Sequence, residues 1–105
     1  MDKIRWQELS WAQQLGNIGS EIGRAGYWHS KNDLVTTQNC LVRVLELLDL
    51  SLDYKHWTST QVRELAIFRE VVADWYSGEK QYNVPPEILE EYCTQFVLAE
   101  INHKK

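Results

Sequence analysis

Apolar residues recur along this chain with the period of an α-helix, and no stretch alternates apolar and polar residues for long. In the first segment, about residues 3–28, large apolar side chains follow one another at intervals of four and three residues. This spacing places them within an arc of roughly 80° on a helix. The pattern therefore predicts one long helix whose core-facing stripe consists of Trp11, Leu15, Ile18, Ile22 and Ala25.

Three further helices are predicted, each from its own start or stop signal. Asn32-Asp33 offers an N-cap for a second helix that ends at about residue 52. A capping box formed by Thr58 and Gln61 opens a third helix, which stops at Ser77-Gly78. Pro85-Pro86-Glu87 supplies the prolines and the acidic residue that are typical of the first turn of a fourth helix.

The core-facing positions of these three helices are also at helical spacing. They are Leu34, Leu41, Leu45, Leu48 and Leu52, flanked by Val42 and Val44, in the second helix; Leu65, Phe68, Val72, Trp75 and Tyr76 in the third; and Leu89, Tyr92, Cys93, Phe96 and Ala99 in the fourth. The connections are short, which favours antiparallel neighbours. We therefore expect an all-α fold, an up-and-down antiparallel four-helix bundle that forms a single domain over residues 1–105.

Four of the five glycines share one face of the first helix. With an alanine they form a second series at helical spacing: Ala12, Gly16, Gly19, Gly23 and Gly26. Each glycine in a helix interior costs about 1 kcal/mol relative to alanine, so the series needs a compensating contact. A groove without side chains lets another helix approach closely and gain dispersion energy. Three interpretations are open: the groove packs a helix of the same chain, it is the seam of a homodimer, or the helix breaks at Gly16 or Gly26.

The polar face of the first helix is a candidate binding surface. Trp6 and Trp28 fall on this face, near Asn17, Glu21 and Arg24. Aromatic residues outside a core stripe are enriched where proteins bind partners. We therefore expect this face to bind a partner, and the alternative is that another helix of the bundle covers it.

Charged residues also fall inside the apolar arcs of the other helices. Asp49 lies in the arc of the second helix, Arg69 in that of the third and Glu100 in that of the fourth. Charged groups are almost never buried without partners, so we expect an inward polar cluster with an ion pair between Asp49 and Arg69. A polar pocket that binds a small-molecule ligand is one alternative interpretation, and simple exposure of these charged residues to solvent is another.

Two short motifs have the spacing of known catalytic or metal-binding elements. Glu100 and His103 have the spacing of di-iron sites in helical bundles, but such sites need a second motif and further glutamates. Arg24 and His29 have the R-x4-H spacing of HEPN ribonucleases. No nucleophile has a base at a position that the sequence supports, so we expect no catalytic residues, no metal and no cofactor.

The bulk composition narrows the classes of partner and compartment. The chain has 15 acidic and 11 basic residues, and its only basic block is the terminal Lys104-Lys105, which argues against nucleic acid as a partner. Cys40 and Cys93 are far apart in sequence, as is usual for reduced cysteines in the cytosol. No apolar run approaches the roughly 18–20 residues that span a bilayer. We expect a cytoplasmic protein without membrane contact.

Leu15-Gly16-Asn17-Ile18-Gly19-Ser20-Glu21 resembles the first helix of a family of small bacterial four-helix proteins, and residues 45–50 and 63–74 resemble the same family. No activity has been assigned to this family, so the resemblance implies a fold and no substrate. The chain is more faintly similar to the four-helix proteins encoded in rRNA intervening sequences and to retroelement accessory proteins. Those proteins form oligomers and some of them bind nucleic acid, so the similarity implies that this chain forms oligomers.

These observations together favour a non-enzymatic helical protein that acts by self-association, as a homodimer or other homo-oligomer, or by association with another protein. A HEPN-like or rRNA-intervening-sequence-like protein associated with nucleic acid is the first alternative. A helical bundle that binds a small-molecule ligand is the second.

Overall fold

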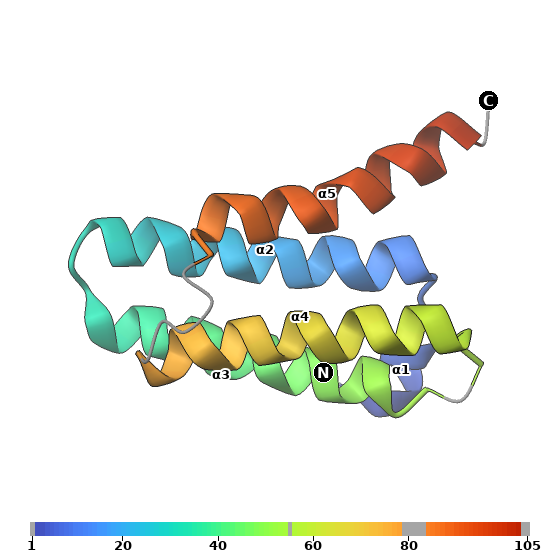
Figure 1. The fold of residues 1–105 in the computed structure, drawn as a ribbon, viewed down its shortest axis with the longest axis horizontal. Coiled ribbons are helices and arrows are strands. Elements are labelled where there is room, and N and C mark those ends of the chain that lie inside the picture. Colours follow the sequence, from blue (N-terminus) through green and yellow to red (C-terminus); the bar gives the residue numbers. More distant parts are fainter. Residues whose placement is uncertain (1, 55, 79–83, 104–105) are drawn as a thin grey trace.

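The computed structural model describes residues 2–54, 56–78 and 84–103, and for residues 96, 97 and 99–103 it describes the backbone alone. Over this part of the chain the regular secondary structure is entirely helical, which confirms the all-α prediction. The helices are α1 (Lys3–Gln7), α2 (Trp11–Ser30), α3 (Leu34–Leu52), α4 (Ser59–Ser77) and α5 (Pro86–His103). Figure 1 shows α2, α3 and α4 running along the long axis, whereas α5 diverges from α2 toward its C-terminal end. Among the described residues, no helix combines the length and the apolar character needed to cross a bilayer.

The prediction of one long first helix is wrong, because the chain turns between Gln7 and Trp11 and forms two helices. A capping box ends the continuity: the Ser10 side chain accepts from the backbone N of Gln13 at 3.1 Å, and the Gln13 side chain accepts from the backbone N of Ser10 at 2.8 Å. These bonds satisfy N–H groups that a free helix N-terminus would leave without partners. The glycines do not interrupt α2, which continues without a break to Ser30.

The other predicted boundaries are confirmed. Asp33 caps α3 by accepting from the backbone N of Thr36, and the capping box of Thr58 and Gln61 opens α4. Gly78, at φ +79°, ends α4 in the left-handed conformation that favours glycine. α5 begins at Pro86, one residue after the predicted proline pair starts.

Helix α2 is central to the packing. Both α5 and α3 pack against α2, while α4 and the short α1 pack against α3 (Figure 1). Between α4 and α5, the rings of Phe68 and Tyr92 stack with their centroids 5.3 Å apart. The core is built from all five helices and includes Trp6, Leu15, Ile18, Ile22, Ala25, Leu41, Val44, Leu48, Leu65, Phe68, Val72, Leu89 and Cys93.

Two residues that the sequence placed in the core are instead exposed. Leu34 is 63% exposed and Tyr76 is 40% exposed, and Val42, predicted to flank the core stripe, is 38% exposed. The buried side of α3 centres on Val44 and the buried residues one turn before and after it. The predicted leucine stripe is therefore rotated to one edge of the buried side of α3. The predicted core positions Phe96 and Ala99 have side chains outside the described part of the chain.

Candidate functional site

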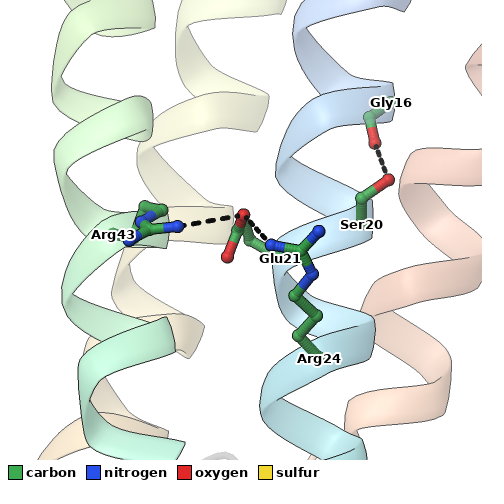
Figure 2. A network of polar contacts seen from close by, with 5 residues as sticks. All are labelled: Gly16, Ser20, Glu21, Arg24 and Arg43. Carbon is green, nitrogen blue, oxygen red and sulfur yellow. Dashed lines mark hydrogen bonds and ion pairs between the residues drawn. The ribbon is translucent and has the colours of Figure 1, made fainter. Parts of the chain in front are cut away.

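The predicted binding face lies along the edge where α2 packs on α3. Glu21 occupies the middle of this edge, and only 13% of its side chain is exposed. Its Oε1 accepts from Nη1 of Arg24 at 3.1 Å and lies 3.6 Å from Nη1 of Arg43 on α3 (Figure 2). Asn17, one turn earlier, donates through Nδ2 to a backbone carbonyl of its own helix at 2.8 Å, and Trp28 is 36% exposed. The polar face of α2 is thus tied to α3 by a glutamate between two arginines.

Trp6 does not share this exposed face, so this part of the sequence-based expectation is wrong. Its side chain is 0% exposed, and Nε1 donates a hydrogen bond to Oγ of Ser51 at 2.9 Å. The expectation assumed that one helix carries Trp6 and Trp28 in a common register. Because the chain turns before Ser10, α1 packs against α3 and that register is lost.

A buried polar network joins α1, α2 and α3 around Ser51. The Oγ of Ser51 donates to Oε1 of Gln14 at 2.6 Å. Nε2 of Gln14 in turn donates to the carbonyl oxygens of Trp6 at 3.1 Å and Leu9 at 3.2 Å. Trp57 Nε1 donates to the carbonyl oxygen of Ser51 at 2.9 Å. Each polar side chain of the network has a partner, as buried polar groups require.

This network was not predicted, although the spacing of its residues in the sequence contains the signal. Gln14 lies four residues before Ile18, and Ser51 lies three residues after Leu48, so both polar residues fall on the buried faces of their helices. Both are 1% exposed. Polar residues within an apolar stripe, one on each of two helices, were sufficient to predict a pair.

A pocket opens between α2 and α3 beside the contact of Glu21 with Arg43. Its volume is about 510 Å³. Its wall combines leucine side chains with carboxylates and a guanidinium, so it can accommodate a small molecule that has both apolar and charged groups. The lining residues are Trp6, Asn17, Glu21, Arg43, Glu46, Leu47, Asp49 and Leu50.

At Gly19 and Gly23, the glycine groove of α2 is filled by α5 of the same chain. A Cβ added at Gly19 would lie 2.8 Å from Cβ of Cys93, and one added at Gly23 would lie 2.9 Å from Oε1 of Glu90. The structure therefore agrees with the interpretation that the groove packs a helix of the same chain. At these two glycines, α5 occupies the space that a helix from a second copy would need.

The expectation of an inward polar cluster is right about the pairing and wrong about the location. Arg69 donates through Nε to Oδ1 of Asp49 at 2.6 Å and through Nη2 to Oδ2 at 3.3 Å. This hydrogen bonding raises the pKa of Arg69. The side chains of Asp49 and Arg69 are 57% and 38% exposed, so the pair lies at the surface between α3 and α4. The side chain of Glu100, the third predicted member, lies outside the described part of the chain.

Apolar residues flank this surface ion pair along both helices. On α3, valines stand seven and fourteen residues before Asp49; on α4, a valine and a tyrosine stand seven residues before and after Arg69. Because seven residues are close to two helical turns, each series lies along one edge of its helix. We call the surface formed by these six residues the α3–α4 seam: Val35, Val42, Asp49, Val62, Arg69 and Tyr76.

Arg24 and His29 do not come together in one site. Arg24 points to the α3 side of α2, where it binds Glu21. The ring of His29 lies 6.1 Å from that of Trp75 on α4, beside a different pocket of about 380 Å³. Five helical residues correspond to a rotation of roughly 140°, which accounts for the separation.

The remaining titratable residues are those that could bind a metal ion or react as thiols. Within residues 2–54, 56–78 and 84–103, no group of three or more His, Cys, Asp or Glu side chains is placed to hold a metal ion, and the side chains of Glu100 and His103 are not described. Cys40 and Cys93 are free thiols. Burial, followed by the charge of Glu90, raises the pKa of Cys93 to about 12, so this thiol stays protonated near neutral pH.

Comparison of the chain with models of known families, with curated proteins and with solved structures found no match.

Proposed function

We propose that this chain is a non-enzymatic helical protein that acts in the cytoplasm by association with itself or with another protein. We also propose that its four longer helices form an up-and-down bundle, like that of the small bacterial family that residues 15–21 resemble. The three-residue connection between α2 and α3 supports the antiparallel arrangement. The free thiols of Cys40 and Cys93 are the form expected in the reducing cytoplasm.

The observation that carries this proposal is the exposure of bulky apolar side chains along the α3–α4 seam. Val35 is 73% exposed, Tyr76 is 40% exposed, and Val42 and Val62 are each 38% exposed. Apolar side chains scattered singly over a surface are normal, but those gathered on one face mark interaction sites. A helix edge with apolar residues at seven-residue spacing has the pattern of a surface that packs against another helix.

The surfaces first expected from the sequence support association less well. α5 lies in the glycine groove at Gly19 and Gly23, and Trp6 is buried. The rest of the α2 face carries the ion pairs of Glu21, and its aromatic residue Trp28 is 36% exposed. The α3–α4 seam has the larger apolar exposure, so it is the better candidate for contact with a protein.

Photo-crosslinking in the cells that produce the chain tests this proposal. A photoreactive phenylalanine derivative is placed at Val42 in the seam or, as a matched control, at Ile67. Ile67 is 55% exposed on α4 but lies roughly 160° around the helix from Arg69. We expect a discrete protein adduct from position 42 and none from position 67. Equal labelling at the two positions, or no adduct from position 42, would contradict the proposal.

The pocket between α2 and α3 favours a second candidate function, the binding of a small molecule. Its volume of about 510 Å³ is within the usual range for ligand pockets. Leu50 lines this pocket and is partly buried, so Leu50→Trp would fill part of the space. A compound that raises the melting temperature of the wild-type chain but not of Leu50→Trp would support this function. A compound library without such a compound would argue against it.

A further inference from the structure

The centre of the α3–α4 seam carries two opposite charges side by side. The guanidinium of Arg69 binds both carboxylate oxygens of Asp49, at 2.6 Å and 3.3 Å. The pair bridges the two helices, and more than a third of each side chain remains open to solvent. Valines and a tyrosine of the seam lie on both sides of the pair along the helix axes. A partner that covers the apolar residues therefore also covers the ion pair.

Covering this pair restricts the chemistry of the partner. Removing an ion pair from water carries a desolvation penalty that the attraction within the pair often fails to offset, so a purely apolar partner helix would cover Asp49 and Arg69 at a loss. A partner of one charge would match one of the two residues and repel the other. The surface that fits best presents an anion and a cation at the same spacing, with apolar residues on both sides.

A second copy of the seam has this arrangement. In a dimer with a two-fold axis, the same patch serves both subunits, so residue i contacts residue j and residue j contacts residue i. With the axis beside the ion pair, Arg69 of each copy faces Asp49 of the other. Because α3 and α4 run antiparallel, Val42 of one copy then lies over Tyr76 of the other.

We propose that the α3–α4 seam is a homodimer interface whose two-fold axis passes beside the Asp49–Arg69 pair. This inference rests on the proposed function and narrows the partner to a second copy of this chain. It also accounts for the pattern in the sequence. Asp49 and Arg69 fall inside apolar arcs because those arcs serve two surfaces, the core and the seam.

The oligomeric state of the full chain provides the first test. Sedimentation velocity and light scattering over a range of concentrations should give twice the chain mass of 12.4 kDa. Val42→Asp places a charge among the apolar residues and should raise the dissociation constant of the dimer by about tenfold or more. Ile67→Asp adds the same charge on the far side of α4 and should leave the dimer unchanged. A wild-type chain that stays monomeric, or a dimer that Val42→Asp leaves intact, overturns the proposal.

Exchanging the two charges provides a second and more specific test. Asp49→Arg alone places like charges together and should dissociate the dimer. The double variant Asp49→Arg with Arg69→Asp regenerates opposite pairs within one copy and between identical copies, so it should dimerise again. It should not form heterodimers with the wild-type chain, because both contacts between the subunits would then join like charges. Free mixing of the two forms, measured by native mass spectrometry, would mean that the pair acts only within one chain and would overturn the proposal.

The crosslinking experiment at Val42 separates this inference from the proposed function. An adduct with the mass of two chains supports both the proposed function and the homodimer interface. If every adduct joins the chain to a different protein, the proposed function stands and the homodimer is overturned. The absence of any adduct overturns both.

Discussion

Replacing Gly19 by alanine tests how closely α5 approaches α2. The added Cβ would lie 2.8 Å from Cβ of Cys93, whereas non-bonded carbon atoms prefer roughly 3.5–4.0 Å. The Cβ of Cys93 is fixed to the backbone of α5 and cannot rotate away. The two helices must therefore separate to accept the methyl group, and we expect the variant to be less stable than the wild-type chain.

The magnitude follows from two opposing effects. Alanine is more favourable than glycine in a helix interior by about 1 kcal/mol, while overpacking a well-packed contact costs about 1–3 kcal/mol. Gly19→Ala should therefore lower the free energy of unfolding by about 0–2 kcal/mol. Gly26→Ala is the matched control, because its nearest side-chain neighbour, Cβ of Pro86, is at 3.4 Å. That variant should gain about 1 kcal/mol.

Urea denaturation followed by tryptophan fluorescence measures the free energy of unfolding of each variant. A double-mutant cycle isolates the contact, because Cys93→Gly removes the opposing Cβ and Cys93→Ala retains it. The interaction free energy between Gly19→Ala and Cys93→Gly should be stabilising by about 1–3 kcal/mol, because the clash is then removed. The interaction free energy between Gly19→Ala and Cys93→Ala should be small. If Gly19→Ala is as stable as Gly26→Ala, or if the two substitutions at Cys93 give equal coupling, the Cβ of Cys93 does not limit the approach of the two helices.

Two further predictions concern the buried polar network and the alkaline limit of stability. Ser51→Ala leaves the buried Nε1 of Trp6 without its acceptor and should lower the free energy of unfolding by about 1–3 kcal/mol in urea denaturation; a loss below about 0.5 kcal/mol would contradict the role of the network. The pKa of Cys93 rises from 9.0 to about 12 in the folded chain, and burial likewise raises that of Tyr92 from 10.0 to about 12. Because the folded state holds these protons more tightly, their contribution to stability is complete below about pH 9 and is lost as the pH rises toward 12. Denaturation midpoints should therefore fall from pH 8 to pH 11, less steeply in Cys93→Ala, and a flat wild-type profile would contradict this prediction.

Much of the helical layout could be predicted because its signals are local. The capping box at Thr58 and the left-handed Gly78 each depend on a few consecutive residues, and both lie where the sequence placed them. The break before α2 is local as well, but the apolar periodicity continues across it and conceals the capping box at Ser10. A hydrophobic period shows which residues lie on one side of a helix, and it does not show whether two such segments form one continuous helix.

The candidate sites were less predictable because each depends on residues from different helices. The pairing of Asp49 with Arg69 followed from their positions within apolar arcs, but their exposure did not. The pattern cannot show which part of a wide apolar arc is covered by other helices. The prediction for Trp6 was wrong in the opposite direction. Its side chain was placed on an exposed polar face, and the packing of α1 against α3 buries it.

The sequence by itself determined the helical class, most helix ends and the existence of two distinct surfaces on the first long helix, because these depend on residues within a few turns of one another. Only the tertiary structure decided which surfaces are filled. It placed α5 in the glycine groove at Gly19 and left Val35 and Val42 exposed beside the ion pair on α3. The physical reason is that burial is a property of the whole set of packed helices. The residues of one helix do not determine which of its apolar edges another helix will cover.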